Sequence, residues 1–155
     1  MIRFRTLAVL LAGLSLMAMA SVAQGEEATV AYTVSGPDAD GHYTYTLKVT
    51  NNTTGKSISM FEQFHGVNQT GTGTAGDPPN WSHIFSYGTN DTSSVIFYGS
   101  GSPTGSIPPG QTQTGYSWQV SSSAGEPRPG VTLVWFTDAQ GNQSADVVLP
   151  EKDKA

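Results

Sequence analysis

Residues 41–60 read GHYTYTLKVTNNTTGKSISM, and this stretch decides the fold class. Apolar and polar residues alternate along its first half, residues 51–56 are polar, and the alternation then resumes. A period of two gives a strand two distinct faces, so the stretch predicts two strands joined by a turn. Thr44, Thr46 and Lys48 are expected to face solvent. The expected buried face comprises Tyr43, Tyr45, Leu47, Val49, Ile58 and Met60.

Strand patterns recur along the rest of the chain, separated by turns rich in glycine, proline, asparagine and aspartate. The predicted strands besides the hairpin cover 27–35, 81–88, 94–98, 112–120, 131–137 and 143–149. Residues 68–80 have no hydrophobic residue beyond Ala75 and are expected to form a loop. The stretch 94–98 is apolar on both faces, which indicates a strand covered on both sides. Both this stretch and residues 131–137 must lie centrally in a sheet or pair with another chain.

No amphipathic helical stretch is present. Short strands at this spacing predict an all-β fold, an antiparallel β-sandwich of about eight strands.

The N-terminus has the pattern of a secretory signal peptide. Arg3 and Arg5 precede an apolar run at residues 7–20, and small residues follow. Such a run is shorter than the roughly 20 residues that span a bilayer. We therefore expect a signal peptide at 1–23 and a single β-sandwich domain at 24–155, exported to the periplasm or the extracellular space. No later stretch is apolar enough to span a membrane.

The charge limits the classes of partner to expect, and the cysteine content excludes a disulfide. Residues 24–155 contain five Lys and Arg against twelve Asp and Glu, a formal charge of −7, and no cysteine. Five scattered cations cannot follow a phosphate backbone, so nucleic acid is not an expected partner. Without cysteine the exported domain has no disulfide and depends on its hydrophobic core.

Two segments carry a family resemblance. Residues 107–120, IPPGQTQTGYSWQV, and residues 44–59, TYTLKVTNNTTGKSIS, resemble segments of exported bacterial immunoglobulin-like sandwich domains. The resemblance implies an immunoglobulin-like or fibronectin-like sandwich, a fold used for adhesion, carbohydrate binding, assembly and spacing. It transfers no functional residue, and the Cys-Trp-Cys pattern of antibody domains is missing.

The sequence offers little catalytic chemistry. It has no Gly-x-Ser-x-Gly motif, no thiol nucleophile and no paired carboxylates at a suggestive spacing. We predict no catalytic residue, no cofactor and no metal site. Two weaker metal hypotheses remain: calcium at Asp38 and Asp40, whose alternative role is to shape a turn, and copper or zinc at His65 and His83.

Aromatic residues give the candidate binding site. Trp118 and Trp135 fall in strong strand patterns and are expected in the core. Trp81 follows the long polar stretch and has Asn80, His83 and Tyr87 nearby in sequence. These four residues could form an aromatic platform that stacks on sugar rings or grips a protein. The alternative is that Trp81 caps the end of the sandwich.

The sequence thus predicts an exported, non-enzymatic module for binding, adhesion or structural assembly, with a protein or carbohydrate ligand. A carbohydrate-binding module using Trp81 and a small secreted hydrolase or metal-binding protein are the alternatives.

Overall fold

The computed structural model describes residues 26–87, 92–101 and 103–154. The expected signal peptide at 1–23 lies outside the described residues. The described chain forms one 3-10 turn, Pro103–Gly105, and ten strands. The strands are β1 (Ala28–Ser35), β2 (His42–Asn51), β3 (Lys56–Phe64), β4 (Gln69–Gly76), β5 (Trp81–Tyr87), β6 (Thr92–Gly99), β7 (Thr112–Ser122), β8 (Thr132–Asp138), β9 (Gln143–Val148) and β10 (Glu151–Lys152). Within the described residues, no helix is long and apolar enough to cross a membrane.

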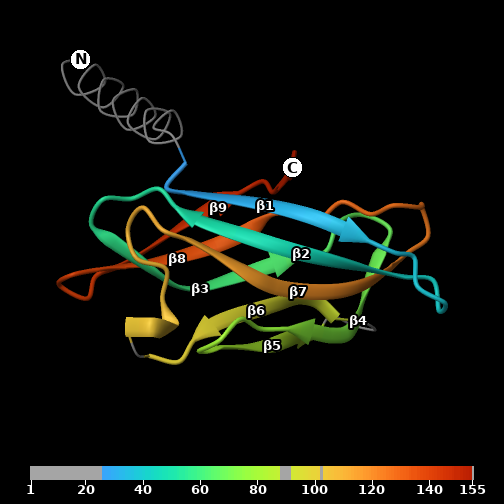
Figure 1. Ribbon diagram of the computed structural model, residues 1–155, viewed down its shortest axis with the longest axis horizontal. Helices are drawn as coiled ribbons and strands as arrows, with labels where there is room; N and C mark the ends of the chain where they lie inside the picture. Colours follow the sequence, from blue (N-terminus) through green and yellow to red (C-terminus); the bar gives the residue numbers. More distant parts are fainter. Residues whose placement is uncertain (1–25, 88–91, 102, 155) are drawn as a thin grey trace, which may run out of the picture.

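The strands pack as two layers, which confirms the predicted antiparallel sandwich (Figure 1). The first layer has the order β10-β1-β2-β7-β4, and the second has the order β5-β6-β3-β8-β9. One residue pair, Gly71 with Thr92, continues the hydrogen-bonded path from β4 to β6. Every strand pairing is antiparallel except that of β1 with β10. The two most apolar predicted strands, now β6 and β8, are central in the second layer.

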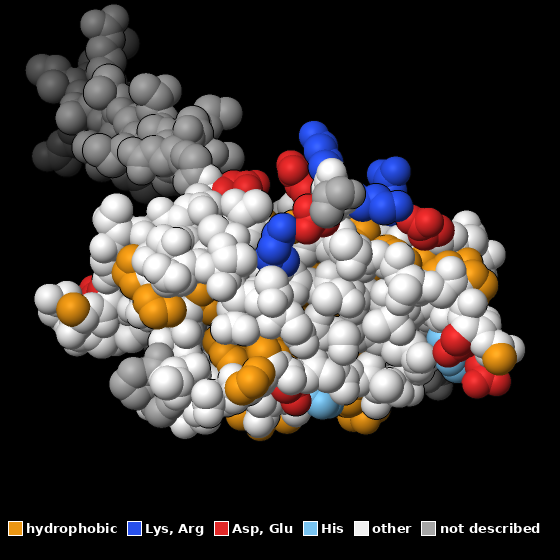
Figure 2. All heavy atoms as spheres, viewed as in Figure 1, with side chains coloured by type: hydrophobic (Ala, Val, Ile, Leu, Met, Phe, Trp, Pro, Cys, Tyr) orange, Lys and Arg blue, Asp and Glu red, His pale blue; other side chains and the backbone are white. Residues whose placement is uncertain are grey.

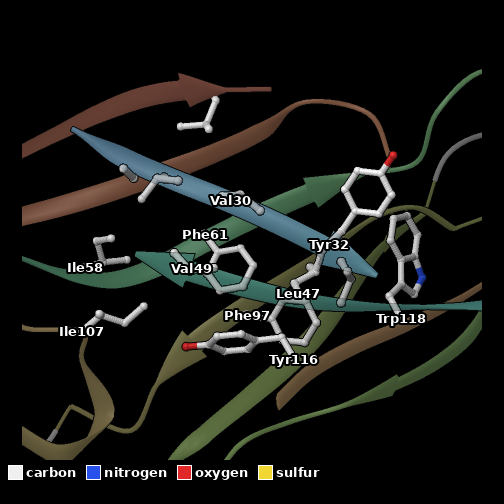
Figure 3. Close-up of a cluster of buried hydrophobic side chains, with 14 of the residues drawn as sticks. Val30, Tyr32, Leu47, Val49, Ile58, Phe61, Phe97, Ile107, Tyr116 and Trp118 are labelled. Atoms are coloured by element: carbon white, nitrogen blue, oxygen red, sulfur yellow. The ribbon is translucent and has the colours of Figure 1, made fainter. Parts of the chain in front are cut away.

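The core lies between the layers and is rich in aromatic rings (Figure 3). Phe61 on β3 meets Tyr116 on β7 edge to face, with ring centres 4.7 Å apart, and stacks on Phe97 of β6 at 5.0 Å. Such contacts add to the free energy gained by burying the rings. Trp118 is fully buried, as the sequence predicts.

The prediction of a loop at 68–80 is wrong over most of its length, because Gln69–Gly76 forms β4. The inward positions of this strand hold Gln69 and Gly71 rather than large apolar residues. Gln69 is buried through hydrogen bonds: it accepts one from the Tyr45 hydroxyl at 2.7 Å and donates one to the Arg128 carbonyl at 2.6 Å. β4 passes close to both layers, where small or hydrogen-bonded side chains fit and bulky ones do not. β4 and β10 are the two strands beyond the expected eight.

Candidate functional site

Trp81 does not form an exposed platform. Its side chain is 5% exposed and its ring lies 5.1 Å from that of Tyr116, edge to face. It belongs to the same core cluster as Phe61, at a ring distance of 6.2 Å. Burial raises the pKa of Tyr116 above its ordinary value, so this ring stays neutral. The burial of Trp81 in the core favours the alternative reading, in which this ring caps the sandwich and is not a stacking surface.

The other three predicted site residues lie in separate environments. His83 Nδ1 is 2.8 Å from a carboxylate oxygen of Asp77, and its ring packs near Phe85. Tyr87, at the far end of β5, is 73% exposed. Asn80 has φ of 65°, a turn conformation that asparagine tolerates well. A binding role for Asn80, His83 and Tyr87 stays a prediction, now without Trp81 as its stacking surface.

The potential calcium ligands serve a hairpin turn. Within the described residues, one group of three metal-ligating side chains has its ligand atoms within 4.8 Å of one another: Asp38, Asp40 and His42. The backbone N–H groups of Asp40 and His42 both donate to Asp38 Oδ1, at 3.0 and 2.8 Å. The β8–β9 turn repeats this geometry around Asp138, which accepts from the N–H groups at 140 and 142. The repeat favours the turn role.

The two histidines of the copper or zinc hypothesis have different neighbours. The His65 ring lies 6.2 Å from that of Trp118, and its Nδ1 is 3.0 Å from the Gly66 carbonyl. His83, on β5, is held by Asp77, which directly follows β4. The structure thus gives each imidazole its own local partner.

A different surface stands out: the outward side of the second layer. Its side chains align in rows across the strands, as the pairing register shows. The middle row runs Ile84, Ile96, Glu62, Leu133 and Val147, and the row beside it runs Ser82, Tyr98, Met60, Trp135 and Ala145. We call these ten side chains the apolar face. Eight of the ten are hydrophobic.

The apolar face is open to solvent. Ile84 is 51% exposed, Val147 62% and Tyr98 38%, and the remaining large hydrophobic residues of the face are partly exposed. Val131 and Leu149, which directly precede β8 and follow β9, are also exposed. Exposed apolar patches of this kind mark interaction sites on soluble proteins.

Three sequence-based expectations fail at this face. The stretch 94–98, within β6, is not covered on both sides by any described residue, since Tyr98 is exposed. Trp135 lies on the apolar face and is only partly buried. The register of β3 shifts between Ile58 and Met60, because one residue of β3 between them has no partner on β8. This extra residue reverses the alternation, so Met60 points outward.

The outward side of the first layer is polar by contrast. Its strands present threonine, serine, glutamine and lysine, including the cross-strand pair Thr33 and Thr46, both exposed. Thr46 therefore faces solvent as expected, with Thr44 and Lys48 partly exposed beside it on β2. In Figure 2, where β1, β2 and β7 lie in front, most of the visible surface is uncharged polar side chain and backbone. An antiparallel layer with one solvated face is expected to look like this. The two outward surfaces of one sandwich thus differ in chemistry.

One charged residue lies within the apolar face. Glu62 occupies the middle strand of the five and the middle of its row, between Ile96 and Leu133. Ser94 Oγ donates a hydrogen bond to Glu62 Oε1. Among the described residues, no hydrogen bond reaches Oε2 of this carboxylate. The centre of the face therefore offers a free acceptor surrounded by apolar side chains.

Comparisons with known proteins define the class of fold. An uncharacterised protein from Nocardia farcinica with an immunoglobulin-like fold superposes with a TM-score of 0.52 at 17% identity, over 76% of this chain and 82% of that one. An exo-β-N-acetylglucosaminidase from Vibrio harveyi gives 0.51 at 13% identity, and 83% of this chain matches only 18% of the enzyme. BcpA, the major pilin subunit of Bacillus cereus, gives 0.50 at 11% identity, over 81% of this chain and 41% of the pilin.

No family model and no curated protein matches the chain. The protein is an immunoglobulin-like β-sandwich, as its two sequence segments suggested. At these identities the likeness shows the fold alone.

Proposed function

We propose that this protein is an exported, non-enzymatic binding module whose apolar face docks on a protein partner outside the cytoplasm. The observation that carries the proposal is the contrast between the two outward surfaces of the sandwich. One is polar, and the other exposes Ile84, Tyr98 and Val147 within a set of ten side chains, eight of them hydrophobic.

Burial of such a surface is the main source of affinity in protein association. Removing apolar area from water yields roughly 25 cal/mol per Å² before the costs of association are counted. Trp135 and Tyr98 lie two strands apart in one row, and aromatic residues of this kind often dominate the energy of an interface. A partner that covers the central strands would bury both rings.

The export part of the proposal rests on the N-terminal pattern at residues 1–23. The acidic, cysteine-free composition of residues 24–155 is compatible with a module that works at a cell surface or in the periplasm.

The test is a binding assay with the labelled mature domain on intact cells and envelope fractions of the producing organism. The variant Ile84→Gln/Val147→Gln changes two exposed positions of the apolar face, and Thr33→Gln/Thr46→Gln is the matched control on the polar side. We expect the first variant to lose at least about tenfold in affinity and the control to bind as the wild type does. Equal binding by both variants would remove the apolar face as the docking surface.

The alternative functions make separate predictions. A carbohydrate module built on Asn80, His83 and Tyr87 would bind glycans in a way that Tyr87→Ala abolishes and that Ile84→Gln/Val147→Gln leaves intact. A hydrolase would turn over a substrate in a broad panel of esters, peptides and glycosides. Turnover by the purified wild-type domain would contradict the non-enzymatic assignment.

A further inference from the structure

We propose that the partner of the apolar face is an amphipathic helix that carries a lysine or arginine on its apolar side, and that this cation pairs with Glu62. The inference rests on the proposed function and names the chemistry of its partner.

Glu62 lies where a partner must cover it. It is central in a face whose neighbouring positions are Ile96 and Leu133 in its own row and Met60 in the next. An apolar partner would take the carboxylate out of water, and a buried charge without a counter-ion opposes binding. Only Oε1 has an internal donor, the Ser94 hydroxyl.

The described residues do not supply the missing cation to this face. In the described part of the chain, Lys48 pairs with Asp153 and Lys56 with Glu27, and the remaining cations lie near or beyond the ends of strands at residues 128, 152 and 154. None belongs to the rows of the apolar face. Charge complementarity therefore assigns the cation to the partner.

A second copy of this chain fits the face less well. A two-fold interface applies the same patch to itself, so the central Glu62 of one copy would approach that of the other. Two carboxylates would then share an apolar interface without a counter-ion. Residues 24–155 also carry a formal charge of −7 in each copy, which adds repulsion.

The dimensions and chemistry of the face suit a helix. Five strands spaced about 4.8 Å apart make a surface roughly 19 Å wide, and a helix with its side chains is about 10–12 Å across. A helix on the open face of an antiparallel sheet is a standard layer arrangement. The aliphatic side chains Ile84, Ile96, Leu133 and Val147 match the apolar stripe of such a helix.

The experiment uses three synthetic helical peptides of about 18 residues, roughly 27 Å long. All three share a stripe of leucine and isoleucine. They differ only at one central position on that stripe, which holds lysine in the first peptide, glutamine in the second and glutamate in the third. Their affinities for the mature domain are measured by fluorescence anisotropy. We expect the lysine peptide to bind about tenfold more tightly than the glutamate peptide.

Two variants with the same charge change give the control. Glu62→Gln should reduce the lysine preference to about twofold or less, while Glu26→Gln, at an exposed position just before β1, should retain it. A preference that survives in Glu62→Gln would overturn the inference. So would equal affinities of the three peptides, or no binding of any of them.

The face variant separates this inference from the proposed function. If Ile84→Gln/Val147→Gln weakens the binding of all three peptides equally and the wild type shows no lysine preference, the apolar face is the docking surface and the inference of a cationic partner is wrong. If that variant and Thr33→Gln/Thr46→Gln bind alike, both proposals fail. A dimer of the wild-type domain in sedimentation that Ile84→Gln/Val147→Gln dissociates would assign the face to a second copy instead.

Discussion

The side-chain amide of Asn51 donates a hydrogen bond to the backbone carbonyl of Ile107 at 2.8 Å, inside the protein. This contact joins the two segments that resemble immunoglobulin-like domains, although 56 residues separate them. The backbone adds two more links, from Asn51 N–H to the Gln111 carbonyl and from Gly110 N–H to the Asn51 carbonyl, both at 2.9 Å. The asparagine at the end of β2 thus holds the segment 107–111 that leads into β7.

Removal of this side chain should destabilise the whole domain. Asn51 is fully buried and also donates to the Lys56 carbonyl, while its Oδ1 accepts from the N–H and hydroxyl of Thr53. In Asn51→Ala the buried carbonyls lose their donor, so we expect a loss of about 2–4 kcal/mol in the free energy of unfolding. Urea denaturation measures this loss in the free energy of unfolding. The neighbouring Asn52→Ala, at an exposed side chain, should cost less than about 1 kcal/mol.

Stability should fall in acid because of the two aspartate turns. The backbone N–H of His42 lowers the pKa of Asp38, and the side chain and backbone N–H of Asn142 lower that of Asp138. A carboxyl whose folded pKa is depressed stabilises the fold above its unfolded pKa, near 4, and this contribution is lost as pH falls through the folded value. Thermal melts from pH 7 to pH 2 should show a shallower decline for Asp38→Asn/Asp138→Asn than for wild type. An identical decline would show that the turns do not contribute.

Trp81 should matter for stability more than for binding. Its ring packs on Tyr116 and Phe61 in the core, so Trp81→Ala should cost about 3–5 kcal/mol in the free energy of unfolding. Tyr87→Ala, at a side chain 73% exposed on the same strand, should change it by less than about 0.5 kcal/mol. Equal stabilities of the two variants would contradict the burial of Trp81.

Gly99 should not tolerate a side chain. A Cβ at this position would collide with the backbone carbonyl of Gly105, so the 3-10 turn and the end of β6 would have to separate. We expect Gly99→Ala to destabilise the domain by about 1–3 kcal/mol. Gly55→Ala is the control, because a Cβ there has no atom within 4 Å and no positive φ constrains it. A neutral Gly99→Ala would show that the turn does not pack as described.

The apolar patterning of the strands was enough to predict eight of them and the sandwich, although in β9 the alternating Ala145 and Val147 face outward and are exposed. It could not identify β4, whose inward Gly71 carries no side chain and whose Gln69 is buried by hydrogen bonds to Tyr45 and Arg128. Such partners are distant in sequence and leave no local signal.

The apolar face escaped prediction for a related reason. The sequence of β6 and of β8 is apolar on both sides of the strand. A strand whose outer side is covered by another layer and a strand whose outer side binds a partner have this same pattern. Trp135 and Tyr98 were therefore indistinguishable from core residues in sequence. The register shift before Met60 hid a third member of the face, since strict alternation from Ile58 places Met60 inside.

Hydroxyl-radical footprinting of the mature domain, with and without the envelope fraction that binds it, tests the central claim most directly. Met60, Tyr98 and Trp135 are oxidisable side chains in one row of the apolar face, whereas Tyr87 belongs to the site predicted from sequence. Docking on the apolar face predicts reduced oxidation of the three row residues and unchanged oxidation of Tyr87. Protection of Tyr87 with the row unchanged would contradict the account.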